Sequence, residues 1–580
     1  MLSHCARAVI FEFLILSLFF RCLQQLGSHR HQQPYYDVDI GDALSFWQRL
    51  KEHCDSNEVD DISDNTSVRV KTGTDDHDSE PKQKCVDVFF VNNGDFVHGT
   101  GLTPVIGDEV DPEYIIPLLE KMPYDAVNVG NHELYDKKTT DYMTRPGGYV
   151  DWWGDRYLTS NIHKRYTPDT DVIAMDGRSY EPLGNRYKIL RGRNSKVLTF
   201  GFLYNFKDVA GGANIGIEKV QSVVKEQWFA DALMKEDYDA VLVLAHMDLV
   251  DPNVEVIRSA VRDILGDEDT PVVFLTGHTH YRGAKQLEDL TLTFEAGKYM
   301  DTVGFVSFPK KESVRGRSGG DASSLFQHVF LDTNRKLLFE DTLGLPSFED
   351  GQTKDGKDLS VFIEQTRKKL GLDTEIGCAP RSYYQERHID APDSLWGLYR
   401  DEVVPKVFSP ETGDDLPVAM LLPSESWRYD LYSNSSLVVD DVYAVAPFND
   451  TVMYLGAFSA DVILEANKTL NGRHYHNHIG NDNDGDEISL ALSWLLPRYI
   501  LTGDVGKSDP TATKYHLYTH DFGKEKIKGV LKKLAPTEEV VFKRTEFTSS
   551  LIWLAFVQKY WPCDETPGFL RGSAPQLQER

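Results

Sequence analysis

The chain has 580 residues, and this length predicts two substantial domains, because a single core rarely grows so large. Hydrophobic residues make up 41% of it and aromatic residues 11%, a composition typical of a globular protein. The formal net charge of −28 argues against a non-specific nucleic-acid binder, because the phosphate backbone would repel it. If so acidic a protein handles phosphate, it needs local cations from Arg, Lys or a bound metal.

The N-terminal segment Ala6–Phe20 is strongly apolar. It is shorter than the roughly 20 residues of a membrane-spanning helix, Glu12 interrupts it, and His4 and Arg7 precede it. This pattern favours a secretory signal, and a signal anchor is the alternative because no clear cleavage site follows. Residues 1–25 are therefore interpreted as a signal-like segment or as a mis-assigned apolar segment. The signal-like interpretation implies the secretory pathway, with the protein extracellular or in a vacuole or lysosome.

Four cysteines remain beyond that segment, and four cysteines permit three disulfide pairings. Pairing Cys54 with Cys85, and Cys378 with Cys563, would keep each disulfide within one predicted domain. Four reduced, buried thiols are the alternative. Glycosylation sequons, which are consistent with secretion, occur at four asparagines: Asn65, Asn434, Asn449 and Asn467.

A polar stretch at 55–84 without hydrophobic period predicts a surface insertion. After it, apolar runs typical of buried strands recur along the chain, at 85–92, 124–130, 198–203, 240–245 and 271–276. Helical patterns lie between them, at 112–121, 217–235 and 254–265. Strands that alternate with helices predict a mainly parallel α/β sheet or sandwich.

The turn-rich stretch Leu343–Lys357 predicts a linker, placed at 346–358, between a first domain at 26–345 and a second at 359–580. The second domain has the mixed pattern of an α+β fold. Its expected elements are an amphipathic helix, three short strands and a core helix, at 359–370, 418–422, 441–445, 515–518 and 551–557. The last of these is too short to span a bilayer.

Polar side chains follow four of the predicted strands in the first domain, directly after each apolar run. They occur in the sequences Gly94-Asp95, Gly130-Asn131-His132-Glu133, His246, and Gly277-His278-Thr279-His280. Open α/β sheets bind ligands at the carboxyl ends of their strands. Carboxylate, amide oxygen and imidazole together suit divalent ions such as Mn, Fe, Zn or Co. Two such ions about 3.5–4 Å apart can activate a water and neutralise a phosphoryl oxygen.

These motifs, in this order and spacing, resemble those of the calcineurin-like metallophosphoesterases, and more narrowly the 5′-nucleotidase type. The resemblance covers most of the chain after about Leu26. It implies a four-layer αββα sandwich followed by a smaller α+β substrate domain. The implied activity is metal-dependent removal of phosphate from nucleotides or related small phosphoesters. The implied cofactors are two divalent metal ions, and the implied partner is the small-molecule substrate.

The resemblance also implies roles for individual residues. Asp95 resembles the carboxylate that bridges both metals, and His280 would belong to the second site. The first site would be completed by three further ligands, Asn131, His246 and His278. His132 resembles the catalytic histidine, which donates to a phosphoryl oxygen or leaving group. Nucleotidases of this type often carry an Asp three residues later, where this chain has Tyr135, with Asp136 one position beyond.

One family motif is missing from this chain. An Asp-x-His pair at the end of the first strand should supply ligands to the metal that His280 shares, but Arg21 and Leu23 stand at those positions. A different N-terminus, from another start or splice choice, would restore the motif. Alternatively, the protein binds one metal and is slow or inactive. A third possibility is that His29 or His31 substitutes.

In the second domain, Leu422–Arg428 resembles the Asn-Ser-Gly-x-x-Arg stretch of the family, and Pro447–Asp450 resembles its Pro-Phe-x-Asn turn. Arg428 is thereby implied to pair with a substrate phosphate, with a structural salt bridge as the alternative. Phe448 is the second candidate for substrate binding. Tyr515–Phe522 resembles a late strand of the family, yet no Gly-Gly-Asp follows it.

The leading functional hypothesis is a 5′-nucleotidase-like hydrolase in which metal-activated water removes phosphate. A catalytically impaired binding protein on the same scaffold is the first alternative, because the Asp-x-His motif is absent. A phosphodiesterase or diphosphohydrolase is the second.

Overall fold

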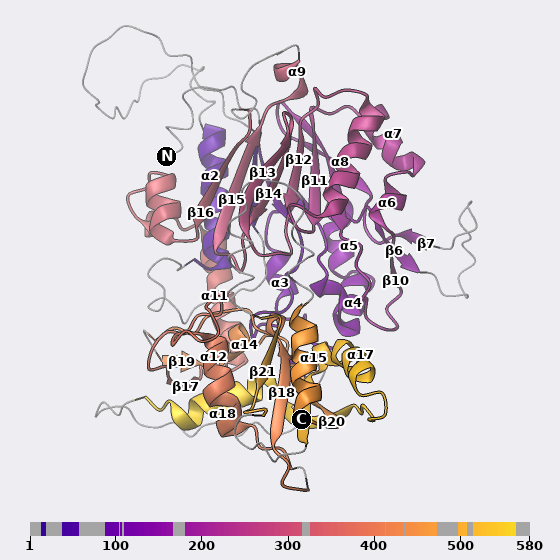
Figure 1. The fold of residues 1–580 in the computed structure, drawn as a ribbon. Coiled ribbons are helices and arrows are strands. Elements are labelled where there is room, and N and C mark those ends of the chain that lie inside the picture. The colour runs from indigo at the N-terminus through magenta and orange to yellow at the C-terminus, as the bar shows by residue number, and fades with distance from the viewer. Residues whose placement is uncertain are drawn as a thin grey trace. The chain divides into compact units, whose positions relative to one another are not determined.

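Figure 1 shows the fold in a computed structural model of the 580-residue chain. The chain forms two compact units, Met1–Leu370 and Gly371–Arg580, each treated by itself. The structure describes residues 13–18, 38–56, 87–103, 105–106, 109–165, 180–315, 325–411, 413–433, 436–472, 497–506 and 514–563.

Two sheets form the centre of unit 1. The first has the strand order β16–β15–β1–β2–β5, with bounds Gln327–Asp332, Thr302–Phe308, Phe13–Leu18, Asp87–Asn92 and Ala126–Val127. The second has the order β13–β14–β12–β11–β9–β8, with bounds Arg282–Glu288, Thr291–Ala296, Val272–Thr276, Ala240–His246, Lys196–Leu203 and Tyr187–Arg191. In the second sheet the four inner strands run parallel, as predicted, and an antiparallel strand closes each edge. In the first sheet β1, β2 and β5 run parallel, β15 is antiparallel to β1, and β16 is antiparallel to β15.

The side-chain alternation of β2 explains how the layers stack. Phe89 and Val91 join a core that also contains buried residues of the second sheet, including Leu244. Phe90 points to the other face and stacks on Trp47, with ring centroids 4.9 Å apart. Trp47 belongs to helix α2 (Ile40–Ser56), which covers that face.

The second sheet is covered on its far face by helices α6 (Val220–Val223), α7 (Gln227–Lys235) and α8 (Pro252–Leu265), whose apolar residues share a core with β9, β11 and β12. The layers therefore run helix, sheet, sheet, helix. This confirms the predicted αββα sandwich.

The remaining elements of unit 1 are short. The helices and helical turns are α3 (Ile116–Leu119), η1 (His132–Leu134), α4 (Lys137–Thr144), α5 (Tyr149–Trp153), η2 (Gly154–Arg156), α9 (Lys311–Val314), η4 (Lys336–Thr342) and α10 (Phe348–Gly351). The strands are β3 (Val105–Ile106), β4 (Glu109–Val110), β6 (Ile162–Arg165), β7 (Tyr180–Pro182) and β10 (Ile215–Ile217).

Strand β1 lies inside the segment that the sequence led us to interpret as a secretory signal. It pairs in parallel with β2 and antiparallel with β15, so it has partners on both sides. In this fold Phe13–Leu18 is therefore an inner strand of the sheet. The rest of the predicted signal-like segment 1–25 lies outside the described residues, so that interpretation stays a prediction. A six-residue apolar run suits a buried strand as well as a signal core. Arg21, Leu23, His29 and His31 lie outside the described residues.

The boundary between the units falls after the predicted linker. Helix α11 (Lys354–Lys369) belongs to unit 1 and packs against α2. Gly41 and Gly356 permit this close approach, since a Cβ on Gly41 would lie 2.2 Å from the Gly356 carbonyl oxygen. The stretch 346–358 therefore contains packed helices, and the predicted start of the second domain at 359 falls within α11.

Unit 2 is built on a sheet with the order β21–β18–β22–β20–β23. Its strands are Tyr499–Thr502, Val418–Pro423, Tyr515–His520, Thr451–Phe458 and Lys543–Thr548. Helices α15 (Ala460–Gly472) and α17 (Lys524–Leu534) share a core with one face of the sheet. The other face meets a core that includes α12 (Leu395–Leu398), α14 (Val439–Val445) and the predicted core helix α18 (Ser549–Tyr560). This is the predicted α+β pattern.

The other elements of unit 2 are β17 (Glu375–Cys378), η5 (Tyr399–Val403), α13 (Val404–Val407), η6 (Ser424–Ser426), β19 (Ser436–Val438) and η7 (Asp521–Gly523).

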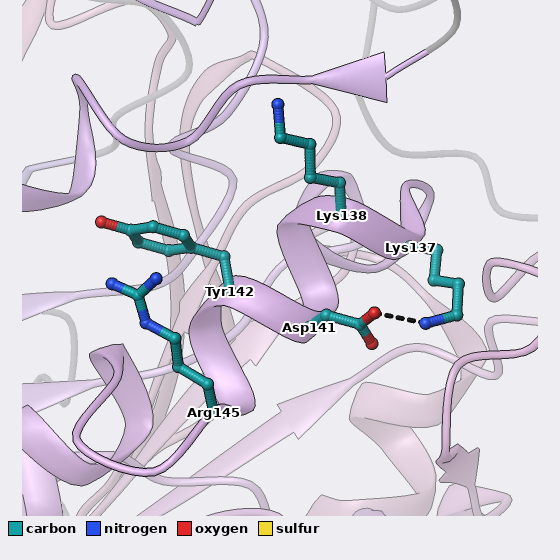
Figure 2. Close-up of a pocket in the computed structure, with 5 residues that line it drawn as sticks. All are labelled: Lys137, Lys138, Asp141, Tyr142 and Arg145. Atoms are coloured by element: carbon teal, nitrogen blue, oxygen red, sulfur yellow. Dashed lines mark hydrogen bonds and ion pairs between the residues drawn. The ribbon is translucent and has the colours of Figure 1, made fainter.

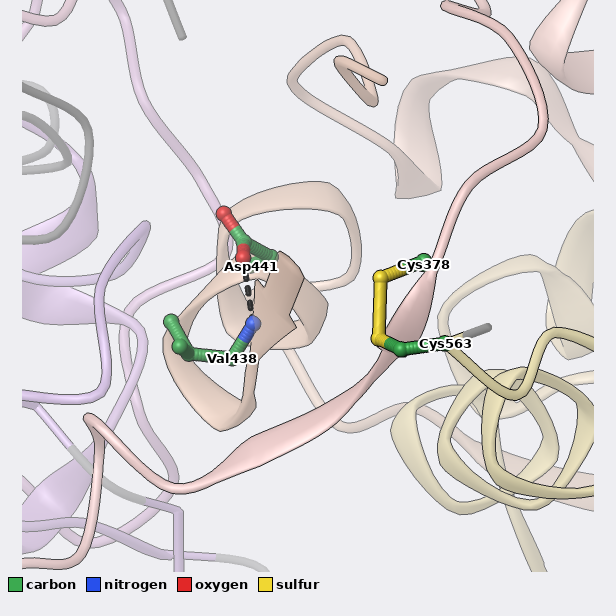
Figure 3. Close-up of a disulfide and its surroundings, with 4 residues drawn as sticks. All are labelled: Cys378, Val438, Asp441 and Cys563. Atoms are coloured by element: carbon green, nitrogen blue, oxygen red, sulfur yellow. Dashed lines mark hydrogen bonds between the residues drawn. A yellow bond between two sulfur atoms is a disulfide. The ribbon is translucent and has the colours of Figure 1, made fainter. Parts of the chain in front are cut away.

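One strand prediction in unit 2 is wrong, because the run at 441–445 is part of helix α14. The Val438 backbone N–H donates to Asp441 Oδ2 over 2.6 Å (Figure 3), a bond that fixes the first turn of the helix. Nearby, Figure 3 shows the disulfide between Cys378 and Cys563, which confirms that predicted pair. Cys85, the predicted partner of Cys54, lies outside the described residues.

Within the described part of the chain, no helix combines the length and apolarity needed to cross a membrane.

Candidate metal centre

Three of the predicted metal ligands meet at the carboxyl ends of the strands in unit 1. Asp95 follows β2, His246 ends β11, and His278 follows β12. Their candidate ligand atoms all lie within 4.8 Å of one another. Asp95 and His246 are buried, whereas His278 is partly exposed. The structure therefore brings together three residues that the sequence predicts as metal ligands, and their role as ligands stays a prediction.

The ring of His246 lies between the Asn93 carbonyl oxygen and the Asp95 carboxylate. Its Nδ1 lies 2.7 Å from the Asn93 carbonyl oxygen, which can only accept, so Nδ1 carries the proton. In the neutral ring, Nε2 is then the acceptor, and it lies 3.0 Å from Asp95 Oδ2. Burial opposes protonation of His246, but the Asp95 carboxylate outweighs it and raises the pKa of the ring. Two acceptors this close would be stabilised by a shared proton or a cation.

Asn131 supplies a further oxygen at the same place. Its side-chain nitrogen donates to the Tyr135 hydroxyl over 3.0 Å, which fixes the orientation of the amide. Among the described residues, the buried oxygen Oδ1 has no hydrogen-bond partner. An unsatisfied buried acceptor destabilises a fold by about 1–3 kcal/mol. A cation would satisfy it.

These features fit one divalent ion. The donor set of carboxylate, two imidazoles and an amide oxygen suits Mn, Fe, Zn or Co, and His246 Nε2 and Asn131 Oδ1 are buried acceptors that such an ion would satisfy. His280 is not part of the cluster, and its ring packs against Tyr299 at a centroid distance of 5.4 Å. For a second ion, only Asp95 and His280 of the predicted ligands lie in the described residues.

Glu133 holds together the two loops that carry Asp95 and Asn131. Its fully buried carboxylate accepts from the backbone N–H groups of Asp95 and Gly130, both over 2.7 Å. It also accepts from Phe96 over 2.7 Å and from Val97 over 3.3 Å. Burial, and then the charge of Asp95, raise its pKa to about 7. This glutamate holds the two loops in position and is not itself one of the candidate metal ligands.

The two loops touch at their glycines. Gly94 has a φ of +84°, and a Cβ there would lie 2.1 Å from the Gly130 nitrogen. A Cβ on Gly130 would lie 2.1 Å from Asp95 Oδ1. Only glycine permits this approach, so the Gly residues of both motifs follow from the packing of one turn on the other.

Two buried asparagines tie the ends of the two sheets together. Asn93 Nδ2 donates to the carbonyl oxygens of Ala245 and Leu275, over 3.1 and 2.9 Å. Asn128 Nδ2 donates to Asn93 Oδ1 over 2.8 Å and to the Leu244 carbonyl oxygen over 3.0 Å. These bonds fix β2 and β5 against β11 and β12, and so fix the relative positions of the ligands.

His132, the predicted catalytic residue, adjoins the cluster. Its backbone N–H donates to Asp95 Oδ1 over 2.9 Å. Its ring nitrogen Nδ1 lies 3.0 Å from Nδ1 of His98. Asp136, which stands one position beyond the family's Asp, instead accepts from the Thr139 backbone N–H over 2.7 Å and begins α4.

The loop of His278 and His280 is held by a second buried acid, Glu295 on β14. Its carboxylate accepts from Thr279 Oγ1 over 2.7 Å and from the Tyr281 backbone N–H over 3.2 Å. Burial raises the pKa of Glu295 to about 7. Both histidines have left-handed backbones, with φ of 83° and 72°. Such strain is concentrated at functional sites, where surrounding bonds hold it in place.

The two predicted substrate-binding residues lie in unit 2. The guanidinium of Arg428 lies 5.1 Å from the ring centroid of Phe448. Arg428 comes after the end of β18, and Phe448 comes before the start of β20. These two strand ends lie at the same edge of the unit 2 sheet as Asp450 and His520, because β18 is parallel to β22 and β20 is antiparallel to it. His520 Nδ1 lies 3.2 Å from Ser426 Oγ.

A charged hollow of about 470 Å³ on unit 1 is formed by one face of α4 (Figure 2). Lys137 pairs with Asp141, and the Arg145 guanidinium lies 3.6 Å from the Tyr142 ring centroid. Lys138, which also lines it, is 3.5 Å from Asp111. No residue of the metal cluster lines this hollow, so we do not assign it to the active site.

Several residues that shape the site escaped the sequence analysis. Glu133 belongs to a motif but was assigned no role, the asparagine pair only adjoins motif residues, and His98 belongs to no motif. The available signal was their position, because each lies within a few residues of a strand end. Their roles depend on contacts between segments that are distant in the sequence.

The sequence and the fold of this chain are similar to those of known proteins. Residues 69–282 match the family of calcineurin-like phosphoesterases, and residues 382–493 match the C-terminal domain of NAD nucleotidase. A 5′-nucleotidase of Candida albicans has a similar structure, with a TM-score of 0.76, 21% sequence identity, and coverage of 95% of this chain and 99% of that one. The predicted fold is thereby confirmed.

Two relatives found by sequence carry names that specify no activity. An uncharacterized protein of Schizosaccharomyces pombe is 25% identical over 520 residues, covering 84% of this chain and 76% of the relative. A secreted protein of Arthroderma benhamiae is 25% identical over 431 residues, covering 67% of this chain and 61% of the relative. The chain thus carries a calcineurin-like phosphoesterase domain and a nucleotidase-type C-terminal domain, and the predicted enzyme class, a metallophosphoesterase, is confirmed at that level.

Proposed function

We propose that this protein hydrolyses phosphate monoesters of small molecules, with nucleoside 5′-monophosphates as the first substrate class to test. The observation that carries the proposal is the convergence of Asp95, His246 and His278 with the unsatisfied oxygen of Asn131. A divalent ion bound there would polarise a phosphoryl oxygen and lower the pKa of an attacking water.

The residues of the chain would divide the remaining work. Asp95 anchors the site, because one carboxylate oxygen faces His246 and the other accepts from the His132 backbone. His132 would donate from its ring to a phosphoryl oxygen or to the leaving-group oxygen, a contribution of about 10²–10⁴-fold in rate. The buried asparagines and Glu133 would keep these groups in register.

In unit 2, Arg428 would pair with an anionic group of the substrate, and Phe448 would provide an apolar face for it. The stacking of the guanidinium on the ring supports this pairing, since it orients the planar donors of Arg428. The NAD nucleotidase-type match of residues 382–493 includes both residues and supports a nucleotide-like substrate.

A metal-binding protein with little or no turnover is the second candidate. It is favoured by the donor set itself, because one ion has a full set of ligands and a second would have only Asp95 and His280 among the described residues. A two-ion mechanism would need ligands from elsewhere.

The two candidates separate in one experiment on the purified full-length protein. Metal content is measured by elemental analysis, and phosphate release is measured from nucleoside monophosphates, p-nitrophenyl phosphate, a bis-ester and a dinucleotide. Turnover of the monoesters that requires the bound metal supports the proposal. Bound metal without phosphate release from any substrate would support the second candidate, a metal-binding protein without turnover. A preference for the bis-ester or the dinucleotide would favour a diesterase or a diphosphohydrolase.

We also propose a setting in the secretory pathway, supported by the Cys378–Cys563 disulfide, which persists in oxidising compartments, and by the secreted Arthroderma benhamiae relative. Glycosylation follows as a prediction. A mobility shift of the native protein on treatment with an endoglycosidase would support this setting, and a reduced, unglycosylated native protein would contradict it.

A further inference from the structure

The ring of His132 has a partner that no motif of the sequence identifies. Nδ1 of His98 lies 3.0 Å from Nδ1 of His132, within hydrogen-bonding distance. The rings meet edge to face, with centroids 5.1 Å apart and planes at 73°. Both side chains are buried, at 8% and 2% exposure, so water competes little for this bond.

No carboxylate of the adjacent sequence takes this position. Tyr135 stands where related nucleotidases often have Asp, and its ring contacts His132 edge-on at 5.2 Å. Asp136 is engaged at the start of α4, where it accepts from the Thr139 backbone N–H. The Nδ1 side of His132 therefore faces an imidazole.

The position of His98 is determined by the structure around it. Its backbone is left-handed, with a φ of 69°, which is uncommon for a residue with a Cβ. The two residues before it, Phe96 and Val97, donate their backbone N–H groups to the buried carboxylate of Glu133. The same carboxylate holds Gly130, two residues before His132. One buried acid thus fixes both halves of the histidine pair.

This arrangement has a consequence for His132. A hydrogen bond between two Nδ1 atoms contains one proton, and it engages that edge of the His132 ring whichever histidine donates. The backbone of His132 is fixed separately by Asp95 Oδ1. With the backbone and Nδ1 both held, the orientation of the ring is fixed, and the proposed catalytic role falls to Nε2.

We propose that His98 is a positioning residue that orients the His132 ring through Nδ1, in the place where related nucleotidases use a carboxylate. This inference rests on the proposed function for its catalytic consequence, and on the geometry alone for the hydrogen bond. His98 acts through His132 and does not itself touch the substrate.

The kinetic test compares three variants of the full-length protein. His98→Phe keeps a ring but removes the hydrogen bond, and His98→Asn places an amide group near the position of Nδ1. His328→Phe is the matched control, because His328 is an exposed histidine on β16 in the same unit. Rates are measured with a nucleoside 5′-monophosphate, whose leaving group needs a proton, and with p-nitrophenyl phosphate, whose leaving group does not.

We expect His98→Phe to lower kcat for the nucleotide about 10- to 100-fold, with KM and metal content little changed. The loss should be several-fold smaller for p-nitrophenyl phosphate, and His98→Asn should recover most of the rate. Unchanged kcat in His98→Phe, or equal losses with both substrates, would overturn the proposal. So would loss of metal in step with activity, because it would indicate a merely structural role.

A second readout does not depend on turnover. Imidazole ¹⁵N spectra of histidine-labelled protein report which ring nitrogen carries the proton, and the His132 signals are assigned by their absence in His132→Gln. His98→Phe should shift the His132 Nδ1 signal, whereas His328→Phe should not. If the wild-type protein hydrolysed nothing yet showed this shift, the proposed function would fail and the histidine pair would stand. An unshifted Nδ1 signal would refute the pair itself.

Discussion

Polar side chains are buried at the strand ends of both units, but the two groups of side chains differ in charge. In unit 1, Asp95, His246 and His278 bring their ligand atoms within 4.8 Å of one another. In unit 2, burial lowers the pKa of His520 to about 3 and raises that of Asp450 to about 8, so both are neutral near pH 7. The first set of groups suits a cation. The second set, which is neutral, suits a structural role in which the side chains support neighbouring residues through hydrogen bonds.

This difference in charge indicates how each unit would contribute to catalysis. The unit 1 cluster consists of acceptors that approach one another, an arrangement stable only when something positive joins them. In unit 2 the charged group is Arg428, stacked on Phe448, and the buried groups nearby are uncharged. We therefore expect unit 1 changes to affect metal content and kcat, and unit 2 changes to affect KM.

The largest effect is expected from Asp95→Asn. The amide keeps the shape of the side chain but removes the negative charge that faces His246 and accepts from His132. We expect bound metal to fall several-fold and kcat/KM to fall by about 10³ or more. Elemental analysis and initial rates measure both quantities.

Asp289→Asn, which changes an exposed aspartate in the same unit, is the matched control and should behave as the wild type. If Asp95→Asn kept its metal and its activity, the cluster would not be the metal centre.

Glu133→Gln should be the next most severe change. The new amide group would direct N–H donors at backbone N–H donors that now bond to the carboxylate. A lost buried bond to a charged group destabilises by about 1.5–3 kcal/mol, so the midpoint of thermal unfolding should fall by several degrees. Exposed Glu268→Gln serves as the reference. Equal unfolding midpoints for the two variants would show that Glu133 does not hold the loops.

Arg428→Ala tests the contribution of unit 2. If Arg428 binds an anionic group of the substrate, KM should rise about 10-fold while kcat and metal content change little. Arg387→Ala is a close control, because that guanidinium lies 5.0 Å from the Tyr384 ring centroid in the same unit. A kcat loss without a KM change would contradict the division of labour between the units.

The smallest effect is a pH dependence in unit 2. The pKa of Asp450 is about 8 in the fold against 3.8 when unperturbed, so the folded chain holds the proton more tightly. Its contribution to stability is complete below about pH 4 and is lost as the pH rises through 8. Asp450→Asn removes this loss.

The measurement is thermal unfolding of both proteins at pH 5 and pH 8. The midpoint of Asp450→Asn should gain on the wild type by about 4 °C or more between these values. Parallel pH profiles would indicate that Asp450 is ionised throughout.

The clustering of the three candidate ligands could be predicted from the sequence, because each follows or ends an apolar run that is recognisable locally. Asp95, His246 and His278 follow three such runs, and parallel strands bring their carboxyl ends to one edge. The family resemblance then supplied the roles that spacing alone could not.

The errors have local causes. The run at 441–445 looks like a strand, but the bond from the Val438 N–H to Asp441 begins a helix there. Phe13–Leu18 is apolar enough for a signal or a strand, and its pairing with β2 and β15 depends on segments that are distant in the sequence. His98 and Glu133 could not be assigned because their roles arise from contacts between distant loops.

The most direct test of the metal centre is the metal content of three proteins purified side by side: the wild type, His246→Ala and His280→Ala. The account predicts about one tightly bound divalent ion in the wild type, its loss in His246→Ala, and its retention in His280→Ala. Equal metal content in the wild type and His246→Ala would contradict it.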